Sequence, residues 1–137
     1  IAETVKNNTS IARIRLTSKD FDNTMHQFLN YLYSNCCQVI DPATNEITLN
    51  IPNTVETLEF YASLANVSQK NPLAWERSQL TELFNDEKIA IYINCPWGRG
   101  QHKEELNVKT VRIPAGPNNK QGTLLITDSV AVFNHTG

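Results

Sequence analysis

The sequence predicts a single α+β domain with a ferredoxin-like β-α-β-β-α-β core, to which one extra helix and a C-terminal β-hairpin are added. Two observations carry this prediction. Several stretches alternate apolar and polar residues, as half-buried strands do, and between them apolar residues recur every three or four positions, as in amphipathic helices. We therefore expect an antiparallel sheet with helices on one face. The 137 residues form one domain, in which residues 1–10 are a polar N-terminal arm.

The first part of the chain predicts a strand, a helix and a hairpin in that order. Residues 12–16 alternate, and Thr17 or Ser18 can cap the helix that follows. Residues 37–40 and 46–51 are two short strands around a five-residue turn. The apolar face of the helix comprises Phe21, Met25, Phe28, Leu29, Leu32 and Cys36.

Two further helices and three strands follow. A capping-box pattern at Asn53 and Glu56 begins the second helix, and Asn71-Pro72 begins the third. Residues 89–93, 106–113 and 122–133 are strands, with a bulge between Val108 and Val111. A cone-like α+β fold, with the helices on one face of a curved sheet, is the alternative. The apolar stripe of the second helix is Val55, Leu58, Tyr61, Ala62 and Ala65, and the third helix buries Trp75, Leu80, Leu83 and Phe84.

The segment after residue 93 is the first place to look for a functional site, because it gathers reactive and anchoring side chains beside two glycines. It also lies in a basic stretch, since residues 88–120 hold six basic and two acidic residues, whereas residues 41–87 hold two basic and eight acidic ones. Such a charge split suits an oriented interface. We predict a non-enzymatic protein–protein binding or assembly module that engages a protein partner or itself. The predicted binding residues are Trp97, Arg99, His102, Lys103, Lys109 and Arg112.

Two other functions remain as hypotheses. Cys95 and His102 are weak candidates for the nucleophile and base of a small cysteine-dependent enzyme. A single-stranded nucleic-acid-binding domain would use Trp97 and the basic residues, with Tyr92 as a stacking residue on its strand, although the net charge of −2 disfavours it.

Metal and cofactor sites are not predicted. The three cysteines, Cys36, Cys37 and Cys95, form no CxxC pair, and the three histidines are scattered. A disulfide from Cys95 to Cys36 or Cys37 would contradict the predicted topology. In that topology the strands at residues 37–40 and 89–93 lie at opposite edges of the sheet, too far apart for a disulfide.

The compartment follows from weaker signals. The sequence starts with Ile1 and contains N-x-S/T sequons at Asn7, Asn8, Asn66 and Asn134. These features, together with the cysteines, favour the soluble part of a larger anchored, secreted or viral component, with a membrane anchor outside this sequence. The predicted location is therefore extracytoplasmic or virion-associated.

Overall fold

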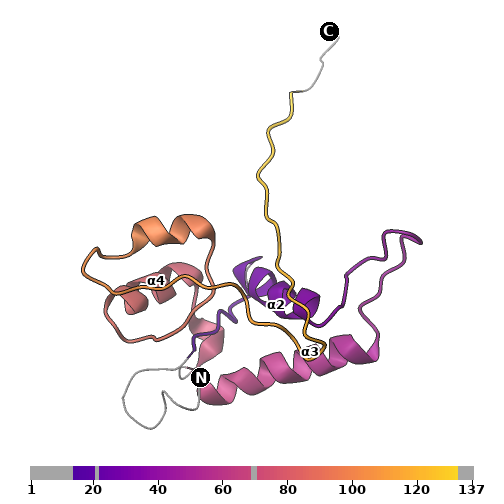
Figure 1. The fold of residues 1–137 in the computed structure, drawn as a ribbon, viewed down its shortest axis with the longest axis horizontal. Coiled ribbons are helices and arrows are strands. Elements are labelled where there is room, and N and C mark those ends of the chain that lie inside the picture. Colours follow the sequence, from indigo (N-terminus) through magenta and orange to yellow (C-terminus); the bar gives the residue numbers. More distant parts are fainter. Residues whose placement is uncertain (1–13, 21, 69–70, 133–137) are drawn as a thin grey trace.

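The computed structural model describes residues 14–20, 22–68 and 71–132 (Figure 1). Helix accounts for 41% of the structure and strand for 3%, so the described residues form no sheet, and the predicted ferredoxin-like core is wrong. The elements are α2 (Asp22–Ser34), α3 (Pro52–Ser63), η1 (Leu64–Val67), η2 (Pro72–Ala74), α4 (Arg77–Asn85) and η3 (Pro96–Gln101).

The predicted strands fail as a sheet because they lack pairing partners among the described residues. Residues 107–115 and 120–132 have no regular secondary structure. Local alternation predicts an extended backbone, but a sheet also requires hydrogen bonds from a neighbouring strand. In segment 14–16, the Arg15 N–H donates to the Ile91 carbonyl of segment 89–93 at 3.3 Å. The bulge near Val108 has no ladder to interrupt.

The predicted hairpin at residues 37–51 is present only in a minimal form. One antiparallel bridge joins Ile40 to Ile47, and the Asp41 N–H donates to the Glu46 carbonyl at 2.9 Å. In Figure 1 this hairpin projects away from the helices. Both bridge residues are exposed, so the turn closes without contributing to a core.

The helices form close to their predicted positions, but α2 and α3 bury only part of the predicted faces: Leu32 and Tyr61 are buried as predicted, whereas other predicted positions are exposed. In α2, Met25 is 56% exposed, while Gln27 and Asn30 are buried. In α3, Leu58 is 56% exposed, while Thr57 is buried. Gln27, Asn30 and Thr57 bond to groups in other segments, which overrides the apolar pattern within each helix. The buried Thr54 hydroxyl, by contrast, has no hydrogen-bond partner in the described part of the chain. The full buried sets are Gln27, Asn30, Leu32 and Ser34 in α2, and Thr54, Thr57 and Tyr61 in α3.

The third predicted helix is split in two. η2 forms after Pro72, the backbone is extended at Trp75, and α4 begins at Arg77. The Gln79 side chain accepts a hydrogen bond at 3.0 Å from the Glu76 N–H, which completes a capping box at the start of α4. This second start signal explains why the helix is interrupted.

A buried polar cluster joins α2 and α3 to segment 14–18. The Gln27 Oε1 atom lies 3.0 Å from the Thr17 amide nitrogen, 3.1 Å from the Thr17 hydroxyl and 2.9 Å from the Tyr61 hydroxyl. The Tyr61 ring also packs edge-on against Phe28 and Tyr31, with centroids 5.5 and 5.4 Å away. This cluster fixes how the two helices pack.

The end of α2 is tied to α3. Cys36 adopts a left-handed conformation with φ 60°, and the Cys37 N–H donates back to the Leu32 carbonyl at 3.2 Å, which ends the helix as a Schellman turn does. Cys37 is therefore buried and Cys36 exposed, the reverse of the predicted apolar face. The Asn35 amide donates to the Thr57 hydroxyl at 3.0 Å and to the Glu56 carboxylate at 2.9 Å.

Residues 116–122 form a turn that docks against the end of α2. A Cβ atom at Gly116 would collide with the Ser34 carbonyl, and one at Gly122 with the Tyr33 backbone, so only glycine permits this close approach. The Ser34 hydroxyl and the Gly122 backbone exchange hydrogen bonds at 3.1 and 3.2 Å. Beyond this anchor the chain leaves the helices as an extended segment (Figure 1).

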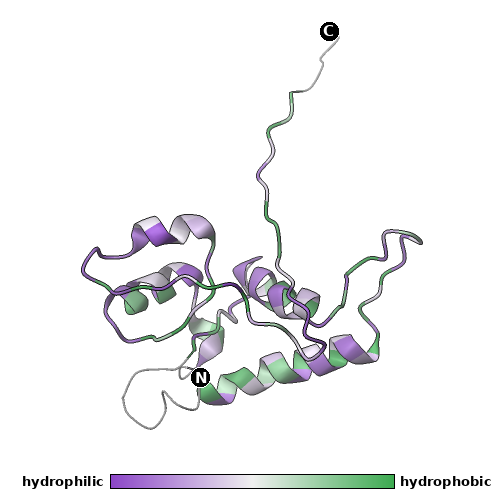
Figure 2. Cartoon of the chain, viewed as in Figure 1, coloured by the Kyte–Doolittle hydropathy of each residue, from purple (hydrophilic) through white to green (hydrophobic). Residues whose placement is uncertain are grey.

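That extended segment carries apolar side chains into solvent. Leu125 is 82% exposed, Val130 98% and Val132 93%, and Figure 2 shows hydrophobic residues interspersed along it. The apolar core of the described residues is small by comparison. It consists of Leu16, Leu32, Cys37, Tyr61, Leu80 and Ile89.

Candidate functional site

The loop that the sequence singled out forms the short helix η3 at the end of an extended segment. Cys95 precedes the helix, Pro96 occupies its first position, and the Gly98 N–H donates to the Cys95 carbonyl at 2.9 Å. Proline suits this position because it has no N–H to leave unpaired. The Asn94 amide packs so closely on Gly98 that a Cβ atom there would collide with it. These contacts hold the loop backbone in one conformation.

Trp97 is the most prominent side chain of this loop. It is 53% exposed, and the guanidinium carbon of Arg77 lies 4.5 Å from its ring centroid. This cation–π contact favours a fixed ring orientation. Arg77 also donates to the Cys95 sulfur at 3.8 Å. The first residue of α4 thus holds both the start of the loop and its aromatic side chain.

His102 sits at the other end of η3 in an aromatic and amide cluster. Its ring packs against Phe84 and Tyr92, with centroids 4.9 and 5.9 Å away. Its Nε2 atom lies 3.4 Å from the Tyr92 hydroxyl, and its Nδ1 atom 3.4 Å from the Asn85 Oδ1 atom. Asn85, the last residue of α4, also donates to the Gln101 carbonyl at 2.8 Å. Both ends of α4 therefore hold the loop.

The charged residues beside the loop pair with one another at the surface. Lys88 and Lys103 contact the Asp86 carboxylate at 3.3 and 3.4 Å. Hydrogen bonds from Lys88 and then Lys103, with their positive charges, hold the pKa of Asp86 below its usual value. All three side chains are well exposed, so solvent screens this cluster and it contributes little to stability.

The six predicted binding residues fall into two groups. Trp97, Arg99, His102 and Lys103 belong to η3 or directly follow it, and all except the half-buried His102 are exposed. Lys109 and Arg112 are exposed in the segment that follows. No structural observation assigns a ligand to any of the six, so their role stays a prediction.

The residues proposed for catalysis make their contacts with different partners. The Cys95 sulfur accepts from Arg77, whereas His102 binds Tyr92 and Asn85. All three cysteines are free in the structure. Among the described residues, no group of three or more His, Cys, Asp or Glu side chains is placed to hold a metal ion.

The sequence-based reasoning missed Arg77, Asn85 and Asn94. Arg77 and Asn85 bracket α4 and look like solvated helix residues, and their contacts reach 16 to 18 residues along the chain. No role was predicted for Asn94, whose Oδ1 atom accepts the Cys95 N–H at 2.9 Å. An asparagine beside the Cys-Pro pair was the one available signal, since Asn side chains often bond nearby backbone groups.

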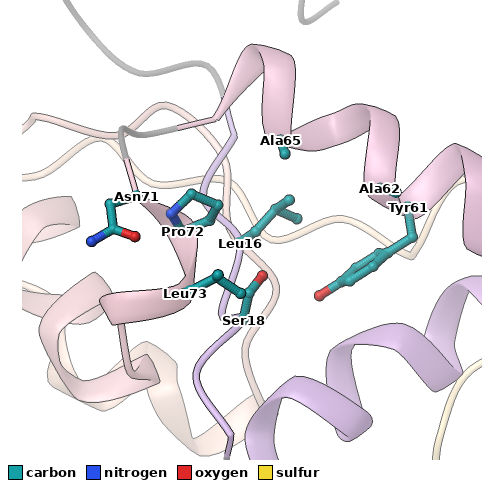
Figure 3. Close-up of a pocket in the computed structure, with 8 residues that line it drawn as sticks. All are labelled: Leu16, Ser18, Tyr61, Ala62, Ala65, Asn71, Pro72 and Leu73. Carbon is teal, nitrogen blue, oxygen red and sulfur yellow. The ribbon is translucent and has the colours of Figure 1, made fainter.

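A separate hollow of about 350 Å³ lies between segment 14–18, the end of α3 and η2 (Figure 3). Leu16, Tyr61 and Leu73 line it, and the Tyr61 ring points toward Ser18. The Tyr61 hydroxyl is already engaged by Thr17 and Gln27. The hollow is thus mainly apolar and includes none of the predicted site residues.

No protein-family model matches the chain. Over 93 residues, or 64% of this chain, it is 31% identical to a protein of Brucella abortus (strain 2308) named "Putative binding protein", and equally to one of that name in Brucella suis biovar 1 (strain 1330). The matched region is 23% of each relative, so the chain spans about a quarter of the length of these relatives.

Two solved structures resemble the described fold. Maltose-bound MalE3 of T. maritima superposes with a TM-score of 0.77 at 18% identity, over 88% of this chain and 32% of MalE3. An ABC transporter solute-binding protein of Thermotoga lettingae TMO, bound with α-D-tagatose, gives 0.60 at 21% identity, over 69% of this chain and 24% of that protein. The chain has the fold of part of a solute-binding protein, which overturns the ferredoxin-like prediction.

No helix in the described part of the chain is both long and apolar enough to cross a membrane.

Proposed function

We propose that the chain is a binding portion of a solute-binding protein, and that the Trp97 loop contributes to a site for a small sugar. One observation carries this proposal: the Trp97 side chain is half-exposed, and Arg77 holds its ring in place. The relatives and one fold neighbour are binding proteins by name, and the two neighbours carry maltose and α-D-tagatose.

The chemistry of the loop suits such a ligand. A sugar presents an apolar C–H face and a rim of hydroxyl groups, and binding sites combine an aromatic or apolar surface with a few placed polar groups. Trp97 offers a flat aromatic face. Arg99 and Lys103, both exposed and close in sequence, supply hydrogen-bond donors.

A titration tests this proposal. Isothermal titration calorimetry of the full chain with maltose and with D-tagatose is expected to show binding of at least one sugar. Trp97→Ala is expected to weaken it by about 2 kcal/mol, roughly thirtyfold, as the loss of a central aromatic contact does. Absence of binding to both sugars would contradict the sugar class.

Leu73→Ala is a matched control. Leu73 also follows a proline in a short 3-10 helix and is 69% exposed, but it lines the separate hollow beside Tyr61. Its removal is expected to leave the affinity unchanged. Loss of binding in Leu73→Ala with retention in Trp97→Ala would move the site from the loop to the hollow.

The other functions predicted from the sequence remain hypotheses. Assembly with a protein partner is favoured by the exposed apolar side chains of residues 124–132. Sedimentation of the full chain tests it, and a monomer at all accessible concentrations would count against self-association. An extracytoplasmic location accords with a solute-binding role and also stays a prediction.

A further inference from the structure

The hydrogen-bond direction at the Nδ1 atom of His102 is determined by the groups that Asn85 contacts. At one end, the Asn85 Nδ2 atom faces the Gln101 carbonyl at 2.8 Å, and its Oδ1 atom faces the Lys103 N–H at 3.4 Å. A carbonyl only accepts and a backbone N–H only donates, so the orientation of the Asn85 amide is fixed. Its Oδ1 atom must then accept from the His102 Nδ1 atom, which carries the hydrogen.

The contacts at the other end agree with the same assignment. The Asn94 Oδ1 atom accepts the Cys95 N–H at 2.9 Å, so its Nδ2 atom donates to the Tyr92 oxygen at 3.1 Å. The Tyr92 hydroxyl hydrogen is then free to be donated to the His102 Nε2 atom, 3.4 Å away. The result is a directed chain of bonds from Asn94 through Tyr92 and His102 to Asn85. In this chain of bonds the Nε2 atom of His102 accepts and its Nδ1 atom carries the hydrogen.

This chain joins the two sides of η3. Asn94 precedes the helix, whereas Gln101 and Lys103 bracket its end, and both sides are bonded to the end of α4 through Asn85. The Phe84 ring packs on both His102 and Tyr92, with centroids 4.9 and 4.8 Å away, and supports the imidazole from α4. The loop is therefore held at its base, while Arg77 holds Trp97 at its tip.

We propose that His102, as the neutral Nδ1–H imidazole, is a positioning residue that sets the placement of the Trp97 loop for ligand binding. This inference rests on the proposed sugar-binding function. His102 acts through the loop and need not touch the ligand. Loss of its two hydrogen bonds lowers the fraction of molecules with the binding-competent loop, and the apparent affinity falls by that fraction.

His102→Phe tests the inference, because phenylalanine keeps the ring packing and removes both hydrogen bonds. In the full chain, sugar affinity is expected to fall about tenfold through the lower competent fraction. His26→Phe is the matched control, since His26 is also half-buried and its backbone carbonyl, which accepts from Asn30, is retained. If His102→Phe does not fold, Tyr92→Phe provides a second test, because it removes only the hydroxyl that bonds His102. Tyr92→Phe is also expected to lower the sugar affinity.

Two measurements do not need a ligand. Long-range ¹H–¹⁵N NMR of the histidine rings is expected to show hydrogen on the Nδ1 atom of His102. Hydrogen on Nε2 would overturn the network. In a Trp75→Phe background, where Trp97 is the one remaining tryptophan of the chain, His102→Phe is expected to increase acrylamide quenching of Trp97 fluorescence.

The outcomes separate the two proposals. If the wild-type chain binds neither sugar, the proposed function fails, while NMR and quenching still decide the positioning role. If the wild-type chain binds sugar and His102→Phe binds equally well with unchanged quenching, the positioning role is overturned and the function stands.

Discussion

The molecule contains two hydrogen-bond networks that differ in arrangement. The buried network joins Gln27 to Thr17 and Tyr61, and the half-exposed network runs beside η3 from Asn94 to Asn85. In the buried one, a single oxygen of Gln27 faces donors from Thr17 and Tyr61. In the half-exposed network, each side chain is hydrogen-bonded to the next one along a chain that begins at Asn94 and ends at Asn85. Removal of a buried acceptor leaves a buried donor unsatisfied, whereas water can replace a member of a solvent-accessible chain of hydrogen bonds. The first arrangement supports stability, and the second supports local placement.

Gln27→Ala tests the buried network and has the largest expected effect. It removes the acceptor of the buried Thr17 N–H, whereas the Tyr61 hydroxyl keeps the Thr17 carbonyl at 3.2 Å and the Thr17 hydroxyl keeps the Asn23 carbonyl at 3.4 Å. Urea unfolding is expected to show a loss of about 3 kcal/mol, because an unsatisfied buried donor costs up to about 3 kcal/mol. Gln38→Ala, on an exposed glutamine, is the control and is expected to change little. A loss below about 1 kcal/mol in Gln27→Ala would show that water reaches the cluster.

Alkaline pH perturbs the same buried region. Burial raises the pKa of Tyr31 to about 12, and burial, followed by the neighbouring Tyr31, raises the pKa of Tyr61 further. Tyrosine in the unfolded chain titrates near pH 10. The stability from these tyrosines is therefore fully present below about pH 10 and is lost as the pH rises through about 12.

The expected loss for Tyr31 over that range is about 2 kcal/mol, because one pKa unit corresponds to about 1.4 kcal/mol. Unfolding curves at pH 9, 10, 11 and 12 measure it, with ultraviolet absorbance at each pH reporting tyrosine ionisation. Tyr31→Phe is the control and is expected to flatten the decline. A wild-type curve that is flat to pH 12 would contradict the burial of both hydroxyls.

Sequence reasoning placed the elements better than it placed their contacts. The predicted helices around α2 and α3 form, although α3 begins at Pro52 with Ile51 as an N-cap that makes no side-chain bond, and not at the predicted capping box of Asn53 and Glu56. Their buried faces are only partly as predicted, because Gln27 and Thr57 bond to groups 10 or more residues away, and periodicity carries no information on such partners. The strands failed for the same reason, since alternation specifies an extended backbone and not the neighbour that completes a ladder.

The candidate site shows the same division. Trp97 and His102 were found because they are crowded into one loop with Cys95 and Lys103. The residues that hold that loop, Arg77 and Asn85, come from the two ends of α4. Their roles depend on how α4 packs beside the loop, so only the tertiary structure shows them.

The half-exposed network can be disturbed by one methyl group, and the expected effect on stability is the smallest of the three. Gly98 is buried against the Asn94 amide, whereas a Cβ atom at Gly100 would meet nothing within 4 Å. Gly98→Ala displaces an amide that bonds both Cys95 and Tyr92, so a loss of about 1 kcal/mol is expected. Neither glycine has a positive φ, so Gly100→Ala is the matched control and is expected to gain a few tenths of a kcal/mol by restricting the unfolded chain.

Hydrogen exchange distinguishes a local effect from a global one. In Gly98→Ala the Cys95 amide loses its Asn94 acceptor, and faster exchange is expected there than in Gly100→Ala. The Thr17 amide, bonded to Gln27 in the buried network, is expected to keep its protection. Equal acceleration at both amides would mean that the two networks are energetically coupled. The loop could then not be placed independently of the helices that support it.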